Sequence, residues 1–98
     1  QGHVDQVGKC INVDEKKGSW EFIIEHKKSN NITVEKGSIA INGVSLTVID
    51  SKVTQFKVAI IPYTFDNTSF KTLNKGDVVN LEFDILGKYL AKMALNFK

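Results

Sequence analysis

The dipeptide Asn42-Gly43 stands between two short runs rich in β-branched and aliphatic residues, 39–41 and 44–49. Both of its residues tolerate positive φ angles, which the two-residue turns of β-hairpins require, so the dipeptide is the strongest short-range hairpin signal in a sequence. The sequence therefore predicts that residues 44–49 pair back on residues 39–41.

Other short segments with interspersed apolar residues surround this hairpin. They lie at 4–13, 20–26, 32–34, 56–61 and 78–83, and polar turn-forming groups separate them. Apolar residues at every second position are typical of half-buried strands. Pro62 ends one of these strands because proline has no N–H to donate to a ladder. With residues 32–34 leading into 38–41, the pattern predicts about six strands.

The pattern changes after Asp84. Leu86, Leu90, Met93 and Phe97 follow at helical intervals, which predicts an amphipathic α-helix over residues 85–98. Its apolar stripe can pack on its own barrel or on a partner chain, and the sequence leaves both open. We expect one domain, with residues 1–84 as the β-structure. Short, evenly spaced strands with a terminal helix indicate an all-β barrel or sandwich.

The composition limits the classes of partner. The chain has 98 residues, 42% of them hydrophobic and 24% charged, as in an ordinary globular domain. So small a domain has modest stability, and pairing with another chain would help it. The net charge of +2 comes from interspersed basic and acidic residues, so we expect no nucleic acid as a partner. A fold of this kind alone does not decide between a nucleic acid, a small molecule and a protein.

Cysteine and histidine usage indicates the cellular compartment. Cys10 is a lone cysteine, and His3 and His26 give no zinc-ligand spacing with it. We therefore expect no metal site and a cytoplasmic location. No apolar run approaches the ~20 residues that a membrane span needs, so we expect no membrane partner. A start at Gln1 rather than methionine indicates a fragment or a processed chain.

Four places combine side chains that can carry chemistry. His3 stands close to Asp5, a pairing suited to proton transfer, although an isolated surface histidine looks the same. Ser45 and Thr47 alternate on one face of a strand, where they are either ligand contacts or ordinary strand hydroxyls. The run 59–64 ends a strand at a proline and leaves backbone groups for a ligand or for water. Asp84 fits a helix N-cap as well as a functional carboxylate.

Four motifs, in this order, resemble the C-terminal lumazine-binding domain of the riboflavin synthase family. They are Gln-Gly-His-Val-Asp at 1–5, Lys-Gly-Ser-Ile-Ala-Ile-Asn-Gly-Val-Ser-Leu-Thr-Val at 36–48, Ile-Pro-Tyr-Thr at 61–64, and Gly-Asp-Val-Val-Asn-Leu-Glu at 76–82. The resemblance covers essentially the whole chain. It implies an all-β fold, a closed six-stranded antiparallel Greek-key barrel with a C-terminal α-helix.

The resemblance also implies a reaction. Members of this family are transferases of riboflavin biosynthesis that convert two molecules of 6,7-dimethyl-8-ribityllumazine into riboflavin and 5-amino-6-ribitylaminouracil, without a cofactor. Each barrel holds one lumazine, and the active site forms between the N-terminal barrel of one subunit and the C-terminal barrel of another in a homotrimer. This chain alone is then expected to have little or no activity and to form a homodimer or a trimer.

The resemblance assigns roles to individual residues. The residues near the reacting atoms are His3, Lys36, Ser45 and Asp84, and those that bind substrate are Gly2, Val4, Ser38, Ser45, Thr47, Ala59, Ile61 and Thr64. Many relatives have aspartate where this chain has Asn42, so a carboxylate role there is open and the residue can serve the turn alone.

Two other functions remain as alternatives. One is a non-catalytic carrier of lumazine or flavin. The other is a barrel that binds single-stranded nucleic acid through aromatic and basic residues. Most aromatic residues stand at core-like positions instead, namely Trp20, Phe22, Phe56, Phe65 and Phe83, which favours a small-molecule ligand.

Overall fold

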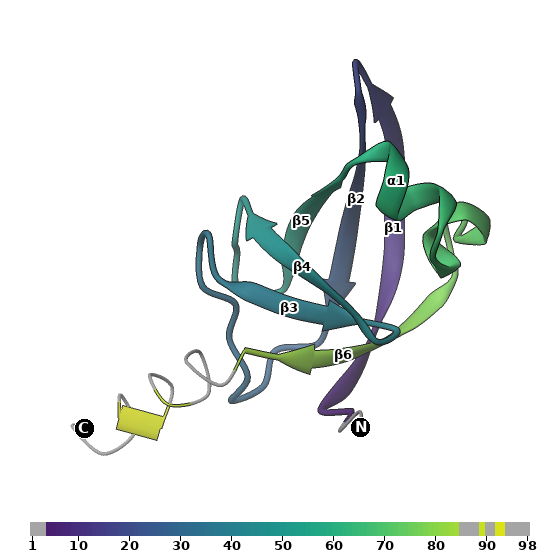
Figure 1. Cartoon of the computed structure of the whole chain (residues 1–98). Coiled ribbons are helices and arrows are strands. Elements are labelled where there is room, and N and C mark those ends of the chain that lie inside the picture. The colour runs from purple at the N-terminus through teal and green to yellow at the C-terminus, as the bar shows by residue number, and fades with distance from the viewer. Residues whose placement is uncertain (1–3, 85–88, 90–91, 94–98) are drawn as a thin grey trace.

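The computed structural model describes residues 4–84, 89, 92 and 93. Within them six strands form a closed barrel (Figure 1). The strands are β1 (Gln6–Lys16), β2 (Ser19–His26), β3 (Ser38–Ile41), β4 (Val44–Ile49), β5 (Gln55–Ile60) and β6 (Val78–Phe83). Between β5 and β6 the chain forms the short helix α1 (Pro62–Asp66) and the 3₁₀ turn η1 (Ser69–Thr72).

The strands follow one another around the barrel in the order β1-β2-β5-β4-β3-β6, and β6 pairs with β1 to close it. All six neighbouring pairs are antiparallel. β3, β4 and β5 are consecutive neighbours, and β6 returns by way of α1 and η1 to lie beside β3, which is the Greek-key pattern. The predicted closed six-stranded antiparallel barrel is confirmed, and the sandwich is excluded.

The predicted hairpin forms at Asn42-Gly43. Both residues have positive φ, 50° and 85°, and Ile41 pairs with Val44 across the turn. The Asn42 side chain also contacts β6, where its Oδ1 accepts a hydrogen bond of 2.8 Å from the N–H of Asn80. The Asn42 N–H donates to the Asn80 carbonyl at 2.9 Å. The hairpin tip is thereby attached to the neighbouring strand on its other side.

The core fills the barrel with the inward side chains of all six strands and of η1. Its buried members are Cys10, Phe22, Ile24, Ile39, Ile41, Val48, Phe56, Val58, Ile60, Phe70, Val79, Leu81 and Phe83. On β2, β3, β5 and β6 they stand two residues apart, as the pleat of a strand requires. The remaining faces of β3 and β4 therefore point outward, and the ligand contacts predicted on these two strands lie there.

Two expected elements differ in the structure. Residues 32–34 form no strand, because their loop is tied to the turn after β4: the Glu35 carboxylate accepts the N–H groups of Asp50 and Ser51 at 3.1 and 2.8 Å. β1 continues beyond the expected end at Val13 to Lys16, since Asp14–Lys16 pair with Ser19–Glu21.

The helix predicted over residues 85–98 lies mostly outside the described residues. Tyr89, Lys92 and Met93 are helical and exposed, whereas its packing on the barrel or on a partner chain rests on residues outside the described part. Among the described residues, no helix is long and apolar enough to cross a membrane.

Candidate functional site

The outer face of the β3–β4 hairpin combines three predicted ligand contacts. Ser38 pairs with Thr47, and Ala40 pairs with Ser45. Side chains opposite each other in an antiparallel pair have Cβ atoms roughly 4.5–5.5 Å apart, so the three hydroxyls and the small Ala40 form one continuous surface. We call these four residues the hydroxyl face.

The hydroxyls of this face are available to a ligand. Ser38, Ser45 and Thr47 are exposed, and none of their side chains makes a hydrogen bond to another described residue. Serine, threonine and alanine also have short side chains, so they leave the strand backbone accessible. A flat polar ring can therefore approach the backbone of β4 closely.

Beside the hydroxyl face, the ladder of paired residues between β4 and β5 ends. The ladder between β4 and β5 consists of Val48↔Val58 and Ile49↔Lys57, so it stops before Thr47 on one strand and before Ala59 on the other. Backbone groups beyond the end of a ladder need partners outside it. The predicted contacts Ser45, Thr47 and Ala59 all lie in this part of the wall, where β4 and β5 diverge (Figure 1).

The predicted contacts Ile61 and Thr64 follow directly after β5. Ile61 is the N-cap residue of α1 and is 60% exposed, and Thr64 is half-buried in the helix. Pro62 begins α1, where its missing N–H costs nothing. The sequence predicted that Pro62 ends a strand, and in the structure Pro62 also begins a helix.

Lys36 and Asp84 lie at the Thr47 end of the hydroxyl face. Lys36 adopts a positive φ of 70°, and its N–H donates to the carbonyl of Val48 at 2.8 Å. The carboxylate of Asp84 lies beside Gly37, where an added Cβ would be 3.4 Å from Oδ2. Both residues are therefore closer to Ser38 and Thr47 in the fold than to the hairpin tip that carries Ser45.

The N-terminal motif is only partly described. Gly2 and His3 lie outside the described residues, and Val4 is exposed on the far side of β6 from β3. The Asp5 carboxylate accepts a hydrogen bond of 2.7 Å from the N–H of Phe83, and its own N–H donates to the Leu81 carbonyl. Asp5 thus holds β6, which is a structural role that the pairing with His3 in the sequence did not indicate.

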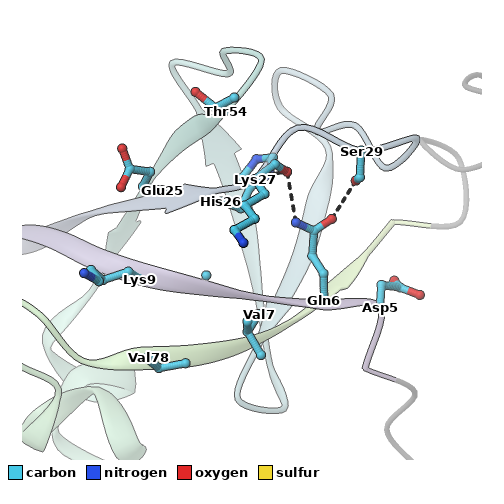
Figure 2. A pocket seen from close by; sticks show the side chains of 11 residues that line it. Asp5, Gln6, Val7, Lys9, Glu25, His26, Lys27, Ser29, Thr54 and Val78 are labelled. Carbon is cyan, nitrogen blue, oxygen red and sulfur yellow. Dashed lines mark hydrogen bonds between the residues drawn. The ribbon is translucent and has the colours of Figure 1, made fainter.

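A hollow of about 730 Å³ lies elsewhere, over the first half of β1 and its neighbours β2 and β6 (Figure 2). None of the predicted site residues that the structure describes lines it. Gln6 spans it, donating to the Lys27 carbonyl at 3.1 Å and accepting from the Ser29 hydroxyl at 2.7 Å. The polar groups of Gln6 and Ser29 are thus already used within the protein, whereas the side chains of the hydroxyl face have no hydrogen-bond partner among the described residues. We therefore place the candidate site on the hydroxyl face.

Lys57 and Cys10 are a charged and a reactive side chain that the fold already uses, one in ion pairs and one in the core. Hydrogen bonding to Asp50 and the nearby Glu21 carboxylate raise the pKa of Lys57, which lies on the outside of β5. Cys10 is fully buried in the core, and this burial raises the pKa of its thiol. Cys10 therefore cannot act as a nucleophile at the hydroxyl face. Among the described residues no group of three metal-binding side chains occurs.

Sequence reasoning missed the residues that hold α1. Trp20 and Phe65 were interpreted as core, but both are only partly buried. Their rings stack with centroids 4.0 Å apart and planes 1° from parallel. A periodicity argument cannot find this pair, because the two residues are 45 positions apart and belong to different elements.

Comparison with known proteins identifies the family of this chain. Residues 1–84 match the family described as Lumazine binding domain. The chain belongs to this family. It is 40% identical over 95 residues to the riboflavin synthase of Actinobacillus pleuropneumoniae, covering 96% of this chain and 44% of that protein. It is 36% identical over 92 residues to the riboflavin synthase of Bacillus amyloliquefaciens, covering 91% and 42%.

A third relative, the riboflavin synthase of Mycobacterium bovis, is 38% identical over 98 residues, covering 95% of this chain and 48% of that protein. The resemblance inferred from the four motifs is therefore confirmed as homology. The chain spans less than half the length of these relatives.

Proposed function

We propose that this barrel binds one molecule of 6,7-dimethyl-8-ribityllumazine, or the product riboflavin, on the hydroxyl face, and that it forms one half of a riboflavin synthase active site. The observation that carries the proposal is the cluster of exposed hydroxyls that have no hydrogen-bond partner among the described residues, at the point where β4 and β5 separate. Membership of the Lumazine binding domain family supplies the ligand class.

The chemistry of the ligand fits this surface. The pyrimidinedione edge of a lumazine has carbonyl and N–H groups, which Ser45, Thr47 and the open backbone of β4 and Ala59 can bind. Ile61 offers an exposed apolar side chain for the ring system, and Thr64 offers a hydroxyl. Lys36, Ser38 and Asp84 supply polar groups at the other end of the face, where the ribityl hydroxyls would lie.

The barrel acts mainly by holding its ligand. The family reaction joins two lumazines, so a second barrel must bring the second molecule face to face with the first. Fixing two reactants in an aligned pair removes much of the entropic part of a bimolecular barrier. We propose the N-terminal barrel of the parent enzyme as this partner, in a cytoplasmic homotrimer, with His3 and the Gly2–Val4 backbone reaching the neighbouring site. The chain alone would have little or no turnover, as a homodimer or as a trimer.

One observation favours a carrier as the second candidate function. The only cysteine is enclosed in the core, so the hydroxyl face has no thiol nucleophile. Binding without turnover is then consistent with the described residues. The alternative of a single-stranded nucleic acid ligand loses support, because Phe22, Phe56 and Phe83 are buried and unavailable for stacking on bases.

The proposal is tested by titrating the purified chain with 6,7-dimethyl-8-ribityllumazine and with riboflavin, following ligand fluorescence. Ser45→Ala and Thr64→Ala each remove one hydrogen bond, so we expect Kd to rise roughly three- to tenfold, corresponding to about 0.5–1.5 kcal/mol. Thr54→Ala is the matched control, because Thr54 is exposed and lines the hollow over β1.

Thr54→Ala should leave Kd within twofold of the original. If this variant weakens binding while Ser45→Ala and Thr64→Ala do not, the ligand occupies the hollow over β1 and the proposed site is wrong. Salt-sensitive binding of single-stranded DNA without any response to lumazine would refute the proposed ligand class.

A further inference from the structure

Helix α1 carries proposed ligand contacts, yet little in the helix itself fixes its position. It has five residues, none of them buried, and its N-cap makes no side-chain hydrogen bond. Isolated helices of this length are not stable in water, because nucleating the first turn costs more than a few hydrogen bonds return. The position of Ile61 and Thr64 must therefore depend on contacts that α1 makes with the barrel.

The main contact of this kind is the stack between Phe65 and Trp20. The two rings are parallel within 1° at a centroid distance of 4.0 Å, and the Phe22 ring lies 6.4 Å from that of Phe65. Trp20 pairs with Ile60, the last residue of β5, so it stands beside the point where the chain leaves the barrel to form α1. Figure 1 shows α1 against this end of β2.

The stack is coupled to the ligand contacts through the backbone. Phe65 follows Thr64 directly, and its N–H donates to the carbonyl of Ile61 at 3.0 Å. On the other side, the Thr64 carbonyl accepts a hydrogen bond of 2.7 Å from the hydroxyl of Thr68. A displacement of the Phe65 ring therefore moves both Thr64 and Ile61 relative to the hydroxyl face.

We propose that Trp20 and Phe65 are positioning residues for the ligand: their stack holds α1 so that Ile61 and Thr64 face a ligand bound on β4. This inference rests on the proposed function, since it assumes that the ligand lies on the hydroxyl face. It assigns to Trp20 a role in affinity, although Trp20 stands on β2, two strands away from β4 in the barrel.

The test compares four variants by titration with 6,7-dimethyl-8-ribityllumazine and by urea unfolding. Phe65→Leu and Trp20→Leu keep an apolar side chain but remove the stack, and we expect each to raise Kd about five- to twentyfold. Trp20→Phe restores an aromatic ring and should bring Kd back within about threefold of the original. Phe56→Leu is the matched control, because Phe56 is buried at the opposite end of β5 and touches the His26 ring rather than α1.

Phe56→Leu should lower the urea midpoint while leaving Kd within twofold. Trp20 is the only tryptophan, so a shift of its emission to longer wavelength in Phe65→Leu would verify that the stack is lost. The inference is overturned if both leucine variants bind like the original chain, or if Phe56→Leu weakens binding as much as they do. If the original chain binds no lumazine, the proposed function fails and this inference fails with it. If the original chain binds lumazine and the Kd is unchanged in Phe65→Leu and Trp20→Leu, only the positioning role is wrong.

Discussion

Asn42 illustrates how one residue serves two strands. Its positive φ forms the turn of the β3–β4 hairpin, and its side-chain oxygen accepts the N–H of Asn80 on β6. The sequence had left open whether a carboxylate is needed here, because many relatives have aspartate. The structure gives the side chain a bonding role that either an amide or a carboxylate oxygen can perform.

Three substitutions of Asn42 separate its two contributions to the free energy of unfolding. Asn42→Asp keeps both the oxygen and the tolerance of positive φ, so we expect a change within about 0.5 kcal/mol. Asn42→Gly keeps the φ angle and loses the hydrogen bond, costing about 1 kcal/mol. Asn42→Ala loses both and should cost about 2–3 kcal/mol. Urea unfolding measures all three, and equal values for alanine and glycine would disprove the contribution of the turn geometry.

Cys10 makes the stability of the barrel sensitive to alkaline pH. Burial raises its thiol pKa above the ordinary 9.0, and the nearby Asp77 carboxylate adds to the increase. The folded chain therefore holds the thiol proton more tightly than the unfolded chain, so this stabilisation is complete below pH 9.0 and is lost as the pH rises through the folded pKa.

We expect the free energy of unfolding to fall more steeply as the pH rises above 9.0 in the original chain than in Cys10→Val, which has no thiol to titrate. Lys57 also has a raised pKa, but its contribution is common to both proteins and cancels in the comparison. Parallel pH profiles, measured by urea unfolding at a series of pH values, would show that the thiol does not titrate differently on folding.

The secondary-structure elements that depend on local sequence, namely the hairpin turn and most strands, were predicted from the sequence. Asn42-Gly43 defined its hairpin, and alternation placed β2, β3, β4, β5 and β6 within one or two residues. Alternation alone failed for residues 32–34, where β-branched side chains occur but the Glu35 carboxylate and the turn after β4 provide other hydrogen-bond partners. The stack of Trp20 on Phe65 could not be predicted from local sequence patterns either, because it depends on which elements contact each other in the folded chain.

At Gly8, β1 closely approaches both of its neighbouring strands. A Cβ added there would lie 2.9 Å from the Glu25 carbonyl oxygen and 2.9 Å from Cδ1 of Leu81. The first of these atoms belongs to the backbone of β2 and cannot move without disturbing the ladder. We expect Gly8→Ala to lower the free energy of unfolding by about 1–3 kcal/mol. Lys9→Ala, on the exposed side of the same strand, should change it by less than about 0.5 kcal/mol, and similar values for both would contradict the close approach.

At the scale of the whole molecule, the Greek-key order brings three separate segments of the candidate site onto neighbouring strands. Lys36 and Ser38 precede and begin β3, Ser45 and Thr47 belong to β4, and Ala59–Thr64 follow on β5 and α1. Because β3, β4 and β5 are neighbours in the barrel, segments that are 7 and 12 residues apart in the sequence lie on adjacent strands. The sequence motifs predicted these residues as ligand contacts, and the barrel places Ser38, Ser45 and Thr47 on one outer surface and Val4 on the far side of β6.

A contact of Asp5 with Phe83 extends the β1–β6 ladder that closes the barrel. Asp5 and Phe83 are 78 residues apart, and the Asp5 carboxylate accepts the Phe83 N–H at 2.7 Å where β6 ends. Without this ladder, which we call the seam, β1 and β6 would each present an unpaired edge. A hydrogen bond to a charged acceptor contributes about 1.5–3 kcal/mol, so we expect Asp5→Ala to lower the free energy of unfolding by that amount. Asp5→Asn keeps an oxygen acceptor and should lose about half as much.

Amide hydrogen exchange locates the effect of Asp5→Ala. Because the lost bond lies at the seam, exchange should accelerate first in the β1–β6 ladder, at Gln6–Lys9 and Val78–Leu81, while the β3–β4 hairpin keeps more of its protection. Loss of protection to the same extent in both ladders would mean that the barrel opens only as one unit, and that Asp5 stabilises the whole fold rather than its closure.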